Sequence, residues 1–477
     1  MPSHSGLPLL YRRRNKYRTQ GPCIMVRDRS SLHNLSPIQV LTLALITLSV
    51  AYLPGCGGGG SSSKSQPPSS NPAQINHIVY MLQENRSFDN YLGKLNDYRA
   101  AKGLGADVDG IPPSGFTNPS FDRSTVVGSF RWATTVCHEQ ISPGWDESHR
   151  QANREDPSAS TGSNDGFVYS AANYARDTGG FDQEGVRSMG YYDEGHLPYY
   201  YFMATQFATS DRFFTSLLSR TPPNRLYSFA ATSAGWTDLP TASVNAKTIW
   251  QMLEENNISW KIYSDGPTTL SFFHAFYVQH QGNVVPYAQY FADARAGNLP
   301  SVSFIQNATG SDEHPTVSVQ RGAAFAKTFI DALMKSPNWK DSVFFLTYDE
   351  AGGIFDHVSP PSAPNPDGIA PIDLKPTDTQ GNFDRYGFRV PLIVISPFTK
   401  PGYVSHTVAD LTAILKFIET RYGLPSLTAR DAAQPDLTEF FDFANAPNLN
   451  PPKPPDQPIG HDVKTGNTLT CSQTQIP

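Results

Sequence analysis

The fold is decided by residues 75–90, which read INHIVYMLQENRSFDN. A run rich in apolar residues comes first, and the polar residues Gln83, Glu84, Asn85 and Arg86 follow it directly. Such an apolar run is typical of a strand that is buried on both faces, as in a parallel sheet. Active sites of open α/β sheets lie beyond the carboxyl ends of the strands. Glu84 and Asn85 are therefore the first candidate site residues.

Similar apolar runs recur along the chain and predict the rest of a sheet. They cover residues 260–264, 301–306, 343–347 and 391–396. Two segments between or after them, 323–334 and 409–422, carry apolar residues at the three- and four-residue spacing of helices. Gly423 is suited to end the second helix. This alternation predicts an α/β sandwich, with a mostly parallel central sheet flanked by helices.

A second acidic cluster follows the expected strand at 343–347. It consists of Asp349 and Glu350, and Gly352 and Gly353 come soon after them. If the two strands are neighbours, these carboxylates meet Glu84, and their repulsion calls for protonation or a bound cation. Taken alone, Glu84 is better explained as capping a turn, and Asp349 and Glu350 as solvated loop acids.

A third segment, SRTPPNRL at residues 219–226, combines a hydroxyl with anion-binding side chains. Two prolines stiffen the loop, and Arg220, Asn224 and Arg225 supply donors suited to an anion. Thr221 is a weak nucleophile by itself, and a divalent cation would lower the pKa of its hydroxyl. Without the other two clusters, this segment is an ordinary proline turn.

The charge balance and the amino-terminal region bear on partners and location. The net charge of −6, from 43 acidic and 37 basic side chains, disfavours nucleic acid as a partner. Residues 38–53 form an uncharged apolar run after Arg27 and Arg29, which is the pattern of a secretory signal. The run ends in Leu-Pro-Gly-Cys56, which resembles a bacterial lipobox, so lipidation of Cys56 would tether the protein to a membrane. Ordinary cleavage and release is the alternative, and both imply export.

The domain boundaries follow from these segments. We expect a leader with an upstream extension at 1–56, a Gly/Ser/Pro linker at 57–74, a catalytic domain at 75–440 and a Pro/Asn-rich tail at 441–477. Outside the leader region, Cys137 and Cys471 either form one disulfide in an oxidising compartment or remain two thiols. The oligomeric state is left open.

Several ordered motifs resemble the bacterial phosphoesterase family, which includes phosphatidylcholine-type phospholipases C and respiratory-burst-inhibiting acid phosphatases. They are INHIVYMLQENRSFDNYLG (75–93), NDGFV (164–168), MGYYDEGHLPYYY (189–201), RTPPNRLY (220–227), TYDEAGGIFDHVSPP (347–361) and GFRVPLIVISPF (387–398). The likeness runs from about residue 75 to about 435. It implies the fold of the alkaline phosphatase superfamily.

The resemblance also implies a site. One divalent metal ion would be bound by five residues, namely Glu84, Asn85, Thr221, Asp349 and Glu350. Thr221 would be the nucleophile and would form a phosphothreonine intermediate that water hydrolyses. The identity of the metal is left open, because an oxygen-rich ligand set fits several hard cations.

The resemblance further places histidines around the phosphoryl group. His149, His280 and His314 match them and are expected to be catalytic, since imidazoles can donate to phosphate oxygens or protonate a leaving group near neutral pH. His357 is expected to orient Asp349 or Glu350.

The function implied is that of a metal-dependent phosphoester hydrolase. The names of the family's members slightly favour a phospholipase C that acts on phospholipids. The alternative is an acid phosphomonoesterase that acts on small phosphoesters, and both would use the same site. The alternative of another class is a surface lipoprotein that binds ligands with an inactive site.

Overall fold

The computed structural model describes residues 72–134, 140–469 and 476. The leader, Cys56, Cys137 and Cys471 lie outside the described residues, so their expected roles stay predictions. None of the helices in the described part of the chain is long and apolar enough to cross a membrane.

The core of residues 72–469 is an eight-stranded sheet in the order β13-β6-β12-β11-β1-β10-β8-β9. Its central strands are β11 (Ser342–Tyr348), β1 (His77–Gln83) and β10 (Val302–Gln306), all parallel. β8 (Trp260–Tyr263) and β9 (Val284–Val285) continue this direction. Within this sheet only β12 (Leu392–Ile395) runs antiparallel to its neighbours. The predicted mostly parallel α/β fold is confirmed.

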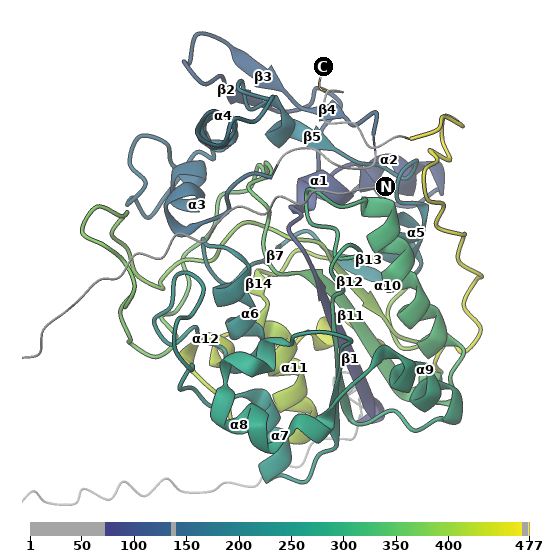
Figure 1. Ribbon diagram of the computed structural model, residues 1–477. Helices are drawn as coiled ribbons and strands as arrows, with labels where there is room; N and C mark the ends of the chain where they lie inside the picture. Colours follow the sequence, from purple (N-terminus) through teal and green to yellow (C-terminus); the bar gives the residue numbers. More distant parts are fainter. Residues whose placement is uncertain (1–71, 135–139, 470–475, 477) are drawn as a thin grey trace, which may run out of the picture. The chain divides into compact units, whose positions relative to one another are not determined.

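Helices cover both faces of the sheet (Figure 1). One side carries α5 (Pro198–Gln206), α9 (Tyr287–Ala296) and α10 (Val319–Met334). The other side carries α6 (Thr221–Ala230), α7 (Ile249–Glu255) and α11 (Thr412–Tyr422). Burial on both faces explains why the strands read as continuous apolar runs.

All five expected strands form, with ends within two residues of those predicted. Three short strands of this sheet were not predicted, namely β6 (Ala208–Ser210), β9 and β13 (Tyr403–Ser405), because two or three residues give no periodicity to detect. The predicted helix at 409–422 begins only at Thr412, since Ala409–Asp410 pairs as β14 with β7 (Phe213–Phe214). It ends as expected at Gly423, whose φ is 65°.

Smaller elements lie beyond the carboxyl end of β1 (Figure 1). They are α1 (Phe88–Leu92), α3 (Trp145–Ala152), α4 (Phe167–Thr178) and the short strands β2 to β5, which fall between Thr117 and Tyr191. They form walls around the strand ends where the candidate site lies.

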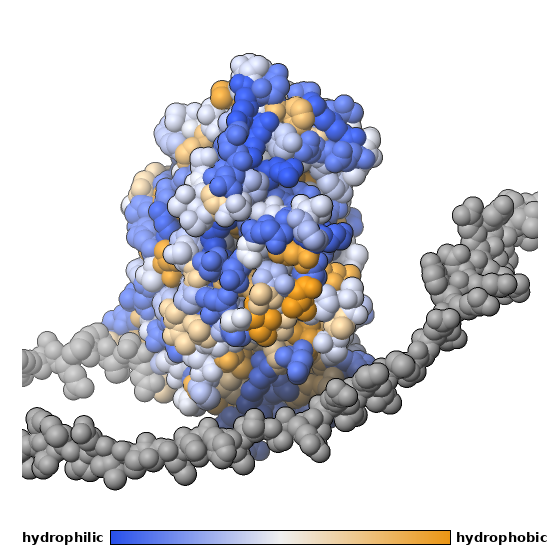
Figure 2. Space-filling view, turned by 90° about the vertical axis from the view of Figure 1, so that its left-hand side faces the viewer, coloured by the Kyte–Doolittle hydropathy of each residue, from blue (hydrophilic) through white to orange (hydrophobic). Residues whose placement is uncertain are grey.

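Apolar side chains gather in a patch on the face shown in Figure 2, which is otherwise largely hydrophilic. The large apolar residues that are exposed in the described chain include Leu239 and Ile372, at 55% and 57%. Ile372 donates its backbone N–H to Gly235 O, 2.9 Å away, and Asp373 accepts hydrogen bonds from the backbone N–H groups of Thr237 and Asp238. These bonds bring the 235–239 and 369–373 loops together.

Candidate metal and catalytic site

The register of the sheet brings the two acidic clusters together. Gln83 and Tyr348, the last residues of β1 and β11, are direct partners, so Glu84-Asn85 and Asp349-Glu350 leave the sheet side by side. The Asn85 backbone N–H donates to Asp349 Oδ1 at 3.4 Å, and Asn85 Nδ2 donates to Glu350 Oε1. The convergence of the two clusters, which required neighbouring strands, is thus present in the structure.

The end of a third strand, β10, lies at the same edge of the sheet and contributes a contact to Glu84. Leu82 pairs with Gln306 at the end of β10. The next residue, Asn307, donates from Nδ2 to Glu84 Oε1 at 2.9 Å. Glu84 is therefore held between the ends of β1 and β10, and its side chain keeps 21% exposure toward solvent.

The carboxyl groups of Asp349 and Glu350 are buried, at 0% and 2% exposure. Burial raises the pKa of Asp349 to about 7, with Arg225 acting against the shift and Glu84 adding to it. Burial and the charge of Asp349 raise the pKa of Glu350 well above its usual range. Adjacent buried carboxylates of this kind favour either bound protons or a cation.

Arg225 ties helix α6 to these acids. Its Nε donates to Asp349 Oδ2 at 2.8 Å, and its Nη2 lies 3.4 Å from Glu84 Oε1 and 3.2 Å from Leu82 O. Asn224, also in the first turns of the helix, accepts from the backbone N–H groups of Ser216 and Leu217 and fixes the preceding loop. The amino end of α6 is thereby held against the strand ends.

Thr221 is the first residue of α6 and lies one turn before Arg225. Side chains four residues apart share a helix face, so Thr221 is directed to the side on which Arg225 meets the acids. Arg220, immediately before it, is close enough to Glu350 to lower the pKa of that carboxyl. A helix amino end favours negative charge, which suits an alkoxide and a phosphoryl group.

The residues present fit a divalent cation. Asn85 Oδ1 is buried and accepts no hydrogen bond from the described residues, and the neighbouring carboxylates supply further oxygens. Asn85 has a φ of 64°, and a Cβ on Gly352 would lie 2.4 Å from Asn85 O. Only glycine allows this approach of the two strand ends. Direct hydrogen bonds and Arg225 link four of the expected ligands, namely Glu84, Asn85, Asp349 and Glu350. Thr221 is the first residue of α6, the helix that Arg225 ties to these acids.

His314 faces the same site. It lines a cavity of about 600 Å³ together with Glu84, Asp265, Asn307 and Asp312. Burial lowers the pKa of His314, and the charge of Glu84 acts in the opposite direction. Its Nδ1 lies 3.2 Å from the Thr316 hydroxyl.

The other two expected histidines do not line the cavity that Glu84 and His314 share. His149 in α3 lines a separate pocket, described below. His280 stacks on Phe276 with ring centroids 4.0 Å apart and lies 6.1 Å from the ring of Trp260, the first residue of β8. The structure therefore places His280 at the amino end of β8, away from the carboxyl ends where Glu84 and Asp349 lie.

The expectation that His357 orients Asp349 or Glu350 is wrong. Its Nδ1 lies 2.8 Å from Asp89 Oδ2 and its Nε2 lies 3.1 Å from Asp109 Oδ1. Burial alone would lower the pKa of His357, but the bond to Asp89 and the nearby acids raise it overall. The side chain takes this direction because Asp356, just before it, is fully buried against Arg389.

Asp89, Asp356 and His357 form a second group whose ligand atoms lie within 4.8 Å of one another, a spacing that could hold a metal ion. Arg389 already lies among them, with Nε 2.8 Å from Asp356 Oδ1 and Nη2 3.1 Å from Asp89 Oδ1. A metal ion here would have to compete with that guanidinium. In the Glu84/Asp349/Glu350 group, Arg225 bonds to Glu84 and Asp349, whereas Glu350 accepts from Asn85 Nδ2 and the Gly352 backbone N–H.

Glu313 was not predicted as a site residue, yet it connects the ends of β1 and β11 with helix α5. It is 0% exposed and accepts hydrogen bonds from the Tyr200 hydroxyl at 2.5 Å, the Tyr348 hydroxyl at 2.8 Å and Gln83 Nε2 at 3.1 Å. Burial raises the pKa of Glu313 to about 7. Gln83 and Tyr348 directly precede the acidic clusters, and His314 follows Glu313. Sequence signals for this role are weak, because Glu313 stands in a polar loop.

The chain belongs to the Phosphoesterase family, whose model matches residues 75–425. It is therefore a hydrolase that acts on phosphoester bonds. This agrees with the site, where acids, a hydroxyl and a helix amino end meet at the carboxyl ends of parallel strands.

Relatives within the family are named as phospholipases C. The chain is 31% identical over 438 residues to phospholipase C B of Mycobacterium tuberculosis, covering 79% of this chain and 80% of the relative. It is 31% identical over 418 residues to non-specific phospholipase C1 of Arabidopsis thaliana, covering 82% and 75%. A hemolytic phospholipase C of Pseudomonas aeruginosa is 30% identical over 440 residues, or 78% of this chain and 56% of the relative.

Solved structures overlap the chain more distantly. A protein of the alkaline phosphatase superfamily from Vibrio parahaemolyticus gives a TM-score of 0.33 at 14% identity, over 72% of this chain and 78% of that one. A lipoteichoic acid synthase from Listeria monocytogenes gives 0.34 at 11% identity, over 51% and 69%. The family assignment rests on the family match and the sequence relatives.

Proposed function

We propose that the protein is an exported, metal-dependent phosphodiesterase of the phospholipase C type, with Thr221 as its nucleophile. The observation that carries this proposal is the pairing of Gln83 with Tyr348, which sets Glu84-Asn85 beside Asp349-Glu350 and under the amino end of α6. A divalent ion held by Glu84, Asn85, Thr221, Asp349 and Glu350 would stabilise developing charge and lower the pKa of the Thr221 hydroxyl.

The reaction would take place in two displacements. The Thr221 hydroxyl loses its proton to solvent, Thr221 Oγ attacks phosphorus, and the bond to the leaving alcohol breaks. This yields a phosphothreonine whose phosphorus still carries the second ester group. His314, on the wall of the larger cavity, gives a proton to the leaving oxygen. Water then attacks phosphorus, His314 accepts a proton from that water, and the bond to Thr221 breaks. The Thr221 oxygen takes up a proton from solvent, and the phosphomonoester of the retained group leaves.

The preference for a lipid substrate over a soluble monoester is supported by the surface next to Thr221. Arg220 forms an ion pair with Asp238, Nη1 to Oδ1 3.2 Å, and exposed Leu239 follows directly. Exposed Ile372 lies on the loop that hydrogen bonds to this segment. Exposed apolar side chains beside a catalytic site suit a membrane surface, and the names of the relatives point the same way.

Export is part of the proposal through the leader at residues 1–56 and the lipobox-like end at Cys56. Expression of the full chain, followed by fractionation and mass spectrometry of its mature amino terminus, tests it. A lipid-modified Cys56 supports a membrane tether, cleavage without lipid supports release, and an uncleaved cytosolic chain contradicts export.

The activity is tested with a substrate panel. The purified protein is assayed on phosphatidylcholine, phosphatidylinositol and phosphatidylglycerol vesicles for released diacylglycerol, and on p-nitrophenyl phosphate for released phosphate. Each assay is run with and without a chelator and after re-addition of single divalent ions. Diacylglycerol release that a chelator abolishes and an added ion restores supports the proposal. Release of phosphate from the monoester alone favours an acid phosphatase, and no metal-dependent hydrolysis contradicts both.

A further inference from the structure

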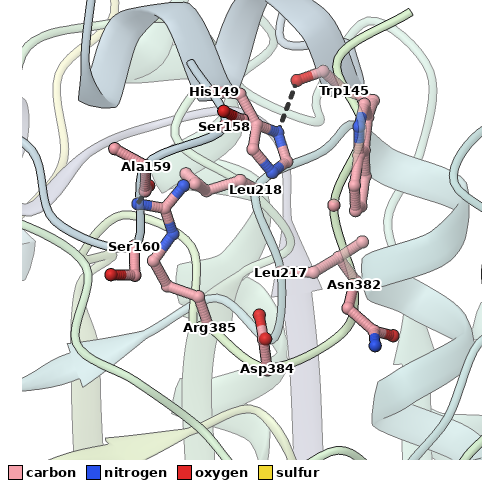
Figure 3. Close-up of a pocket in the computed structure, with 11 residues that line it drawn as sticks. Trp145, His149, Ser158, Ala159, Ser160, Leu217, Leu218, Asn382, Asp384 and Arg385 are labelled. Atoms are coloured by element: carbon pink, nitrogen blue, oxygen red, sulfur yellow. Dashed lines mark hydrogen bonds between the residues drawn. The ribbon is translucent and has the colours of Figure 1, made fainter. Parts of the chain in front are cut away.

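A second pocket lies beside the catalytic loop and is not used by the reaction described above. Its volume is about 190 Å³, and its walls include Trp145, His149, Leu217, Leu218, Asp384 and Arg385. Figure 3 shows the imidazole of His149 between the guanidinium of Arg385 and the indole of Trp145. The pocket therefore combines two nitrogen-bearing side chains with an aromatic wall.

The hydrogen-bonding role of His149 in this pocket follows from its backbone contact. Its Nδ1 lies 2.8 Å from Trp145 O, and a carbonyl oxygen can only accept. Nδ1 is therefore protonated, and in the neutral ring Nε2 carries a lone pair. Burial lowers the pKa of His149 to about 4, so the ring is neutral at pH 7. His149 is 6% exposed, and Nε2 has no partner among the described residues. It needs a ligand that donates a hydrogen bond.

Arg385 requires a ligand that accepts hydrogen bonds. Its side chain is buried to 8% exposure, and Nη1 donates to Ala159 O at 2.7 Å, which fixes the guanidinium. Guanidinium nitrogens only donate, so a ligand must offer an acceptor to the remaining ones. Asp384, on the same wall, balances the charge of Arg385. One neutral ligand that donates and accepts at neighbouring positions satisfies both side chains.

The remaining walls favour a ligand with an apolar face. The rings of Trp145 and His149 are 4.2 Å apart, and the Trp145 indole N–H is already bonded to Thr379 O at 2.9 Å. The indole therefore offers its apolar surface, and Leu217 and Leu218 add to it. Hydroxyl groups on a carbon ring or short chain combine hydrogen-bond donors and acceptors with C–H faces that pack on an indole.

We propose that this pocket is a polyol subsite, which binds the hydroxyl-bearing group that remains on phosphorus when the leaving alcohol departs. The statement that the bound polyol is part of the substrate rests on the proposed function. The statement that the pocket binds a free polyol does not rest on it. Leu217 and Leu218 also line a small recess of about 10 Å³ that reaches Glu350 and Ser219, so the pocket adjoins the Thr221 loop. Neutral head groups such as inositol or glycerol match this lining, because Asp384 offsets the charge of Arg385.

The first test measures binding without catalysis. Wild-type protein is titrated calorimetrically with myo-inositol and with glycerol, and acetamide, choline and inorganic phosphate serve as comparison probes. Saturable binding of a polyol is expected, with affinity roughly 10- to 100-fold weaker in Arg385→Gln, as for loss of a hydrogen bond to a charged group. His149→Phe, which keeps a ring but removes the acceptor, is expected to weaken binding similarly. Arg321→Gln, an exposed arginine on α10, is the matched control.

The second test uses two diesters that share p-nitrophenol as the leaving group and differ in the retained group, myo-inositol or ethyl. Arg385→Gln is expected to lower kcat/KM for the inositol ester roughly tenfold or more, mainly through KM, and to leave the ethyl ester nearly unchanged. Circular dichroism checks that each variant is folded.

The outcomes separate this proposal from the proposed function. If neither ester is hydrolysed but polyols bind in an Arg385-dependent way, the function fails and the subsite stands. If the esters are hydrolysed but no polyol binds, or if choline, acetamide or phosphate binds at Arg385 instead, the polyol subsite is wrong. Equal loss on both esters in Arg385→Gln would also overturn it.

Discussion

Arg225 Nε lies 2.8 Å from Asp349 Oδ2, and both side chains are buried, at 5% and 0% exposure. This ion pair joins the helix that begins at Thr221 to the strand end that carries Asp349 and Glu350. It holds the amino end of α6, where Thr221 lies, against the acids across 124 residues of sequence.

Replacing Arg225 by Met should remove this connection. Breaking a buried pair leaves an uncompensated charge, so the free energy of unfolding of the metal-free protein is expected to fall by roughly 3–5 kcal/mol. Phosphoesterase activity should fall strongly as well, because the amino end of α6 loses its anchor. Urea unfolding and activity assays measure the two effects.

The control for Arg225→Met is Lys247→Met, which breaks the exposed pair with Glu255, where the side chains are 50% and 57% exposed. Exposed pairs contribute about 0–1 kcal/mol, so little change is expected in stability or activity. Equal effects of the two substitutions would contradict a special role for Arg225.

His314 is expected to matter most when the leaving group is poor. His314→Ala should slow hydrolysis of an alkyl ester by roughly 10²- to 10⁴-fold, the usual range for general acid catalysis. A p-nitrophenyl ester, which leaves without a proton, should be affected much less. His274, exposed at the start of α8 (His274–Gln279), gives the control substitution. The same loss on both esters would show that His314 does not protonate the leaving group.

Glu313 should impose a pH dependence on stability. Burial raises its pKa to about 7, whereas an unfolded glutamate titrates near about 4.3. Between these values the folded state binds more protons, so the contribution of Glu313 to stability falls as pH rises, by at most about 1.4 kcal/mol per pH unit. Below about pH 4 both states are protonated and this loss is absent.

Glu313→Gln is neutral at every pH and should remove that part of the slope. Urea unfolding at pH 5, 6 and 7, in the presence of a chelator, gives the measurement. Glu255→Gln, an exposed acid in α7, is the control and should leave the slope unchanged. If wild type and Glu313→Gln lose stability equally between pH 5 and 7, Glu313 does not titrate in this window.

The exposed apolar residues near Arg220, Leu239 and Ile372, should matter for activity on lipid substrates but not for activity on soluble ones. Replacing Leu239 and Ile372 by Asp is expected to lower activity on phospholipid vesicles by roughly tenfold or more, since two large apolar contacts with the membrane are lost. Activity on a soluble diester should stay within about twofold. Val463→Asp alters a similarly exposed apolar residue, at 53%, in the carboxyl-terminal segment and is the control. Unchanged vesicle activity in the double variant would weaken the lipid assignment.

Five strands of the central sheet could be predicted, and so could the convergence of four of the five expected metal ligands, because long apolar runs directly precede those four residues. The period of such runs and the polar residues after them are local features of sequence. Thr221 was found through its loop motif and family resemblance. Its placement depends on Arg225, a contact that no local pattern shows.

The surroundings of the site were less predictable because they depend on side-chain direction. His357 was expected to orient Asp349 or Glu350, but the burial of Asp356 against Arg389 turns it toward Asp89 and Asp109. His280 matched a motif only loosely, and the fold places it near the start of β8. Glu313 has a φ of 70°, and its carboxylate accepts hydrogen bonds from Tyr200 and Tyr348, which are distant from it in sequence.

The most direct test of the proposal that Thr221 is the nucleophile is the activity of Thr221 variants in the metal-loaded protein. Thr221→Val keeps the shape of the side chain and removes the hydroxyl, and Thr221→Ser keeps the hydroxyl. A loss on the order of a thousandfold or more in kcat is expected for Thr221→Val, with substantial activity retained in Thr221→Ser. Phosphodiester hydrolysis by Thr221→Val at the wild-type rate would contradict Thr221 as the nucleophile.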